Sequence, residues 1–319
     1  MWIGVAFGIL TTFIWASSYI FPAMLPDYGA AALMIARAPI VGLCAVLAIA
    51  ATWKSYSHLT RSDWKTAYMC GLIGHFLQPI LLFTCVEYAG IPVGALCWGG
   101  VPVSVALVSN YRARLRNRPF VPYGTLVVPL ALIVVGFIVT NYTELEQLSV
   151  SGTRSMGEFF FGLACGIVQI GLWTWYPIKN AEWMQDHPET STTVWTCAQL
   201  AILLPIGLVA YPLVAWLTPS IDGLFGARPW FFLAIVLWCS IVTTFVAMFF
   251  FNICSARVPT ALVGQLMIFE TVFSILMGLV YDWKLPTVML TAGVILLLAG
   301  VVISLRIFAR FDEQQTSSR

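Results

Sequence analysis

The chain has 319 residues, of which 60% are hydrophobic and only 9% are charged, and its formal net charge is +2. Charged residues make up about 25% of a typical soluble domain, so this composition excludes a soluble fold. We therefore expect a polytopic membrane protein whose few charges set its orientation.

Hydrophobic runs long enough to cross a bilayer recur along the whole chain. A spanning helix needs about 20 mostly apolar residues. Ten such spans are predicted, at roughly residues 2–25, 29–52, 66–88, 91–111, 122–141, 157–178, 191–216, 229–254, 258–280 and 286–307. The connections Pro26 to Tyr28, Ala89 to Gly90 and Ser255 to Arg257 are very short, which predicts antiparallel neighbouring helices.

Basic residues gather in alternate loops. If the N-terminus is cytoplasmic, the cytoplasmic loops and tail hold twelve of the sixteen Lys and Arg residues, and the opposite side holds Arg154, Arg228 and Lys284. This asymmetry is typical of the positive-inside rule and agrees with an even number of spans. The sequence predicts ten helices with both termini in the cytoplasm and a polar midpoint from Asn141 to Gly157.

The two halves of the sequence resemble each other. Span 1 reads FIWASSYIFPAM and span 6 reads GLWTWYPIKNAEW, while LLFTCVEYAGIPVGAL at spans 3–4 matches MFFFNICSARVPTALV at spans 8–9. Five spans per half is an odd number, so the second copy enters the membrane inverted. We predict two inverted repeats, residues 2–142 and 157–308, followed by a cytoplasmic tail at 309–319. Transporters often place a substrate site at the midplane between such repeats.

Together these features resemble a known family. Trp15 stands in the first span, Arg37 in the second within ALMIARAP, Pro102 in the fourth, and Glu270 in the ninth. The plan is similar to the EamA-type branch of the drug/metabolite transporter superfamily. The resemblance implies a carrier of ten helices in inverted repeats, mostly found in bacterial cytoplasmic (inner) membranes, that often exports amino acids or related amphipathic metabolites.

Glu270 is a carboxylate in mid-span, within GQLMIFETVFSILMGLV. An ionised carboxylate there costs roughly 2.5–3.5 kcal/mol on insertion scales, so it should face a partner or a water-filled path. It is a candidate proton-coupling group, or counter-charge for a cationic substrate group. The alternative is a packing acid paired permanently with a basic residue.

Three further polar residues are candidates. Arg37 lies well inside a span and could bind a substrate carboxylate, pair with Glu270, or serve a structural role. His75 and Gln78 share one helical face beside Pro79, which predicts either a cavity wall or an interhelical hydrogen bond.

Aromatic residues form a second candidate set. Five of them lie deep in spans or in helices that the resemblance assigns to the cavity: Trp15, Trp98, Trp173, Trp175 and Tyr176. Aromatic walls suit flat apolar groups or quaternary ammonium groups, and ordinary core packing is the alternative. Gln265 is a further polar candidate for the substrate site.

The sequence lacks GxxxxGK[ST], HExxH and GxSxG motifs and a His-rich metal constellation. We therefore expect no ATP, metal or other cofactor, and no enzymatic activity. The expected partners are a small-molecule substrate, the lipid bilayer and, where transport is coupled, protons, but not nucleic acid.

The leading hypothesis is a secondary transporter that exports a small amphipathic metabolite, best matched by an aromatic or apolar amino acid. Proton coupling and uncoupled exchange both stay open. The first alternative is a carrier of organic or quaternary ammonium cations, motivated by abundant Trp and one deep carboxylate. The second is an integral-membrane enzyme acting on lipids, disfavoured because the polar residues are scattered rather than clustered at one membrane face.

Overall fold

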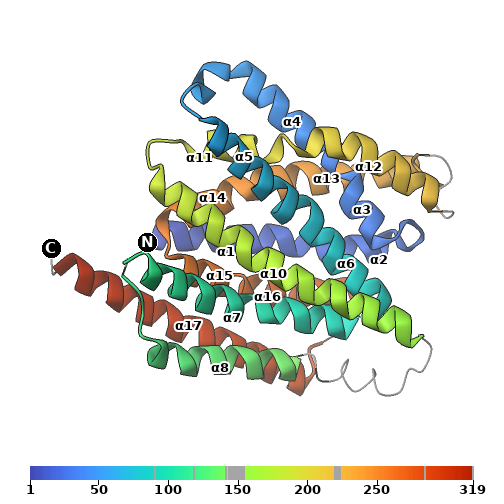
Figure 1. The fold of residues 1–319 in the computed structure, drawn as a ribbon. Helices are drawn as coiled ribbons and strands as arrows, with labels where there is room; N and C mark the ends of the chain where they lie inside the picture. The colour runs from blue at the N-terminus through green and yellow to red at the C-terminus, as the bar shows by residue number, and fades with distance from the viewer. Residues whose placement is uncertain are drawn as a thin grey trace.

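The computed structural model describes residues 1–89, 91–117, 119–140, 142, 155–218, 224–283 and 285–317. All regular structure in these residues is helical, and the helices form one bundle with both termini at the same end (Figure 1). The predicted midpoint from Asn141 to Gly157 lies largely outside the described residues. So do four of the basic residues in the orientation count: Arg118, Arg154, Lys284 and Arg319.

The elements of the first five spans are α1 (Trp2–Ala16), η1 (Ser17–Ile20), α2 (Phe21–Met24), η2 (Pro26–Tyr28), α3 (Ala30–Ala36), α4 (Ala38–Ala51), η3 (Trp53–Tyr56), α5 (Arg61–Cys70), η4 (Gly71–Leu77), α6 (Gln78–Ala89), α7 (Ile91–Leu115) and α8 (Tyr123–Thr140). Those of the last five are α10 (Met156–Asp186), α11 (Thr192–Leu200), α12 (Leu203–Leu217), α13 (Pro229–Ser240), η5 (Ile241–Val246), α14 (Ala247–Arg257), α15 (Thr260–Leu266), α16 (Ile268–Asp282) and α17 (Val288–Ser317).

Nine helical segments of the described chain are long and apolar enough to cross a membrane. The 25-residue α7 occupies the position of the predicted fourth span and makes the tenth long helix. The predicted all-helical, integral membrane fold with ten long helices is therefore confirmed.

Some predicted helix ends are wrong. The sixth span runs to Asp186 and the tenth helix to Ser317, beyond the predicted ends at 178 and 307. The predicted connection from Ser255 to Arg257 is helical, and the turn comes at Val258 instead, which is extended at φ −122° and ψ 137°. Pro259 explains this position, because a proline disfavours the helical conformation of the residue before it.

Several spans are not continuous α-helices, and spans 2, 3 and 8 are irregular where they line one cavity. The second span breaks at Arg37, between α3 and α4, while the third and eighth contain the π-helical segments η4 and η5. Pro39 follows the break and Pro79 follows the start of α6. A proline has no N–H and clashes with the preceding turn, which disturbs the local α-helix. π-Helical turns are rare overall, but those that do occur are often found at functional sites.

The helices pair across the chain in a regular pattern. α1 packs on α14 and α10 packs on α6, which joins spans 1 and 8 and spans 6 and 3. The other large contacts join α7 to α10, α4 to α12, α7 to α15, and α8 to α17. Figure 1 shows the last of these pairs along the lower edge of the bundle.

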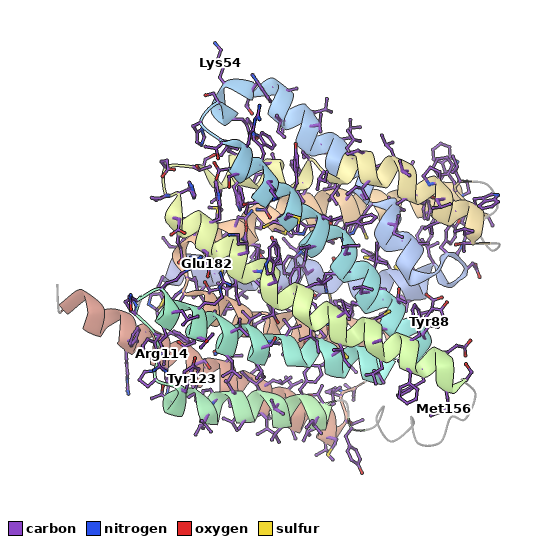
Figure 2. All side chains as sticks on the ribbon, in the orientation of Figure 1. Lys54, Tyr88, Arg114, Tyr123, Met156 and Glu182 are labelled. Atoms are coloured by element: carbon purple, nitrogen blue, oxygen red, sulfur yellow. The ribbon has the colours of Figure 1, made fainter. Side chains whose placement is uncertain are left out.

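The labelled side chains show how the bundle is oriented along its axis. Lys54 and Arg114 lie toward the end that holds both termini, whereas Tyr88 and Met156 lie toward the opposite end (Figure 2). We call the end with both termini the terminal end. Helices therefore alternate in direction, as the short connections predict.

A fully buried polar network joins three spans of the second half of the chain. The Asn180 Oδ1 accepts from Trp195 Nε1 at 2.8 Å and from Gln199 Nε2 at 2.9 Å. Its Nδ2 donates to Asn252 Oδ1 at 2.8 Å, and Asn252 Nδ2 donates to Thr196 Oγ1 at 2.7 Å. Buried polar groups are costly unless paired, so this network fixes the spacing of α10, α11 and α14.

Replacing Asn180 by Leu is expected to lower the free energy of unfolding by about 2–3 kcal/mol, because two buried donors lose their acceptor. Thermal or denaturant unfolding of the purified protein measures this. The double variant Asn180→Leu/Asn252→Leu should cost clearly less than the sum of the two single variants, because both disrupt one network. Additive losses would contradict a shared network.

Candidate functional site

A cavity of about 90 Å³ lies among seven of the spans. Its wall contains seven of the ten residues that the sequence predicts for the site: Trp15, Arg37, His75, Gln78, Trp98, Trp173 and Glu270. These side chains come from spans 1, 2, 3, 4, 6 and 9, and the interrupted parts of spans 2, 3 and 8 all contribute to the wall. We call this space the central cavity.

Glu270 lies in the first turn of α16 and is only 5% exposed. Tyr19 donates its hydroxyl hydrogen to Glu270 Oε1 at 3.1 Å. The other oxygen, Oε2, is buried and has no hydrogen-bond partner among the described residues. Glu270 therefore retains an unused acceptor on a residue of the cavity wall.

Arg37 does not pair with Glu270 in the described part of the structure. Its Nε donates to the Met34 carbonyl oxygen at 3.1 Å and its Nη2 to the His75 carbonyl oxygen at 2.9 Å, while Nη1 donates to the Thr244 hydroxyl. The predicted option of an Arg37–Glu270 ion pair is thus not the arrangement found. The cavity wall holds one cationic and one carboxyl group that do not bond to each other.

His75 and Gln78 both line the cavity, and each contacts the sixth span. Gln78 Nε2 donates to Gln169 Oε1 at 3.1 Å, so the interhelical hydrogen bond that was the alternative to a cavity wall is also present. The His75 ring meets Tyr176 edge to face, with centroids 4.8 Å apart. His75 Nε2 is buried without a partner in the described residues.

An aromatic wall is built around Trp173. Its ring lies 5.8 Å from Trp15 and 5.8 Å from Trp98, centroid to centroid, and 5.2 Å from Tyr176. Phe251 packs behind Trp15 at 5.4 Å. Within the described chain, Trp173 Nε1 is a buried donor with no acceptor. The wall therefore offers both apolar ring faces and one free N–H.

Three predicted site residues lie outside the cavity wall. Tyr176 stands in a second row behind His75, and its buried hydroxyl has no partner among the described residues. Trp175 packs against the hydrophobic core instead. Gln265 is fully buried in α15, where neither amide atom bonds to any described group. Helix geometry explains why Trp175 lies outside the cavity. It follows Trp173 by two residues, and residues two apart point to nearly opposite sides of a helix.

The cavity also contains residues that the sequence analysis does not identify. Tyr19 is one turn after Trp15, at the spacing that places two side chains on one helical face, so the signal was present. Thr243 and Thr244 carry no comparable signal, because they reach the cavity through the π-helical segment η5.

A second cavity, of about 530 Å³, opens at the terminal end of the bundle, where α7, α10 and α17 end and α15 begins. We call it the vestibule. Glu182 of α10 lies in its wall and receives two bonds from Arg112, Nε to Oε1 at 2.8 Å and Nη2 to Oε2 at 2.9 Å. Arg116 adds a third bond to Oε2 at 3.0 Å. These ion pairs join α7 to α10. Glu182 can take part in them only because α10 continues past residue 178, where the sequence predicts the span to end.

The fold and its polar cavity define a multi-pass helical protein of the membrane. The chain is 28% identical over 313 residues to "Inner membrane protein YtfF" of Escherichia coli (strain K12), and the match covers 95% of each protein. The predicted inner-membrane location is thereby confirmed.

The fold is shared with a solved structure as well. A protein crystal structure superposes with a TM-score of 0.69 over 96% of this chain and 98% of its own, at 16% sequence identity. No protein-family model matches the chain.

Proposed function

We propose that the chain is a secondary transporter of the EamA type, which moves a small amphipathic metabolite by alternating access and exports it from the cell. One observation carries the proposal. Buried polar atoms of Glu270, His75 and Trp173 have no partner in the described structure, and all three residues line one cavity beside interrupted helices. Buried polar groups are nearly always paired, so such a cluster indicates a ligand or water site.

The pairing of helices supports an inverted-repeat carrier with repeats at 2–142 and 157–308. The repeat relates span 1 to span 6, span 2 to span 7, and so on. This exchange turns the contact between spans 1 and 8 (α1–α14) into the contact between spans 6 and 3 (α10–α6). It leaves the pairs α4–α12, α7–α15 and α8–α17 unchanged, because each of them joins a span to its own counterpart. The two π-helical segments exchange in the same way. The basic residues at the terminal end favour a cytoplasmic position for both termini.

The charges of the central cavity favour a zwitterion as substrate. Glu270 offers an unused carboxylate oxygen to an ammonium group, while Arg37 supplies a fixed positive charge on the same wall. The rings of Trp15, Trp98 and Trp173 offer apolar faces for a side chain. An aromatic or apolar amino acid combines these features.

The proposal includes a substrate path from the terminal end, where the larger of the two cavities opens. The central cavity, at about 90 Å³, is smaller than the roughly 300–1,000 Å³ of typical ligand sites, so it must widen to hold a whole substrate. The vestibule, at about 530 Å³, is already large enough. With the terminal end in the cytoplasm, entry through the vestibule corresponds to export.

A carrier of quaternary ammonium cations is the second candidate. Trp15, Trp98 and Trp173 surround the cavity beside one carboxylate, which is the arrangement that cation–π binding uses. The guanidinium of Arg37 in the same wall opposes a ligand that carries only positive charge. We therefore place this candidate after the zwitterion.

Flux into proteoliposomes of purified protein tests the proposal. A panel of radiolabelled amino acids and quaternary amines is measured with and without a pH gradient, against protein-free liposomes. We expect flux of an aromatic or apolar amino acid, and the effect of the gradient separates proton coupling from uncoupled exchange. Flux of quaternary amines alone would select the second candidate. Turnover of a lipid substrate without flux would overturn the proposal in favour of an enzyme.

A further inference from the structure

Arg37 differs from the other residues of the central cavity in where its hydrogen bonds go. The guanidinium donates to three groups on three spans: the Met34 carbonyl of its own span, the His75 carbonyl of η4, and the Thr244 hydroxyl of η5. All three acceptor residues also line the cavity. One side chain thus joins the irregular parts of spans 2, 3 and 8.

The bond to His75 has a cause in the sequence. In an α-helix the carbonyl of His75 would accept from the N–H of the residue four positions later, which is Pro79 and has no N–H. A buried carbonyl without a donor is costly, particularly in a membrane. Arg37 Nη2 donates to this carbonyl at 2.9 Å. The guanidinium therefore supplies a donor where proline removes the α-helical one.

The contacts with span 8 run in both directions. Thr244 accepts from Arg37 and passes its own hydroxyl hydrogen to the Cys239 carbonyl at 2.8 Å, bridging the irregular start of η5. The Ser240 hydroxyl lies 3.2 Å from the Arg37 backbone carbonyl, while its shorter hydrogen bond, at 2.6 Å, goes to the Val236 carbonyl of its own helix. The side chain of Arg37 is therefore held by Thr244, and its backbone lies against Ser240.

We infer that Arg37 is a positioning residue that ties η4 to η5, so that the two π-helical walls of the central cavity move as one unit. On this assignment its guanidinium acts on the substrate through the wall it holds and through its fixed charge, rather than as a direct ligand. The guanidinium reaches Thr244 and His75 with two separate nitrogens held in one plane, whereas the three donors of a lysine ammonium all sit on a single nitrogen and do not reproduce this spacing. The link that Arg37 makes between η4 and η5 is a property of the fold. Only the effect of this link on transport rests on the proposed function.

Hydrogen–deuterium exchange of the purified protein tests the tie without any substrate. In Arg37→Gln and in Arg37→Lys, amides of residues 71–77 and 241–246 should exchange about ten-fold faster or more than in the unmodified protein, because both segments lose their shared anchor. Glu270→Gln, which alters the same cavity without touching either bond, should leave both segments unchanged. Unchanged exchange in Arg37→Gln, or protection restored by lysine, would overturn the inference.

A second pair of variants covers the case in which Arg37 variants do not fold. Thr244→Val removes the acceptor on η5 and also the bond from its hydroxyl to the Cys239 carbonyl, so exchange should rise in residues 241–246 and stay low in 71–77. Thr244→Ser keeps the hydroxyl and should match the unmodified protein. Equal exchange in Thr244→Val and Thr244→Ser would contradict the assigned bond.

Transport separates positioning from binding, once a substrate is found. Arg37→Lys should lower the maximal rate about ten-fold or more while KM changes less than about three-fold, because the affected step is wall movement rather than ligand contact. A rise in KM at unchanged maximal rate would assign Arg37 to the substrate instead. Absence of flux in the unmodified protein would defeat the proposed function and leave the exchange result standing.

Discussion

Replacing Glu270 by Gln is expected to weaken binding of a zwitterionic substrate by about 10–100-fold, because a hydrogen bond to a charged group contributes roughly 1.5–3 kcal/mol. The variant keeps the shape of the side chain and its bond from Tyr19. Without substrate, thermal stability should stay equal or rise, since the buried Oε2 has no partner in the described structure and its ionised form is costly to bury. Substrate-induced thermal stabilisation and a ligand-free melting curve measure the two effects.

The matched control is Glu87→Gln, the same change at an exposed position near the end of α6 opposite the terminal end. It should alter neither binding nor stability. In proteoliposomes, Glu270→Gln should also remove any response of flux to a pH gradient. Tyr19, Arg37 and His75 face the same cavity, so a response that survives in the variant would move proton coupling to one of them. Intact amino-acid binding with lost cation binding would reverse the order of the two proposed substrates.

Replacing Gly71 by Ala is expected to destabilise the protein by about 3 kcal/mol or more, at or beyond the upper end of the usual cost of overpacking. A Cβ at this position would lie 2.0 Å from the Gln199 carbonyl oxygen and 2.7 Å from Ile202 Cγ2. The first contact is with backbone, so no rotamer change relieves it. Spans 3 and 7 must separate, and η4 begins at this glycine. Unfolding of the purified variant measures the loss.

Gly171→Ala provides the opposite expectation. This glycine lies inside α10, where an added Cβ meets nothing within 4 Å. Alanine there should stabilise the helix by about 0.5–1 kcal/mol. If both variants had the same melting temperature as the unmodified protein, the close approach of spans 3 and 7 would be wrong.

The sequence predicts the helices well because length and hydrophobicity determine which segments cross a bilayer. The same reasoning places the ends poorly, since helices continue into the interface as far as local capping allows. The eighth span, for example, is predicted to end at residue 254, whereas α14 continues to Arg257 and Pro259 sets the position of the turn. Inversion of the second repeat and the cytoplasmic position of the termini stay predictions.

The candidate site was predicted in part. Deep polar and aromatic residues at helical spacing led to Trp15, His75, Gln78 and Glu270, which the structure brings to one cavity. Periodicity applied more strictly would have excluded Trp175 and included Tyr19.

The partners of Arg37 and the contribution of η5 could not be predicted from sequence. Both depend on π-helical turns. Such a turn closes one residue later than an α-helical turn, so every residue after it points in a different direction from the one that α-helical spacing predicts. Pro79 marks one of these turns, but η5 contains no proline, and the hydroxyls of Thr243 and Thr244 both donate to the Cys239 carbonyl.

The exchange of partners between α1 and α10 has a consequence for synthesis of the protein. The largest contacts of α1 are with α14 and α16, which leave the ribosome more than 200 residues later, whereas α10 finds α6 already in place. During synthesis, α1 therefore lacks its two largest native contacts, those with α14 and α16, until the eighth and ninth spans have been made. A chain truncated before Ala247 lacks α14 and therefore leaves that surface of α1 without its native partner.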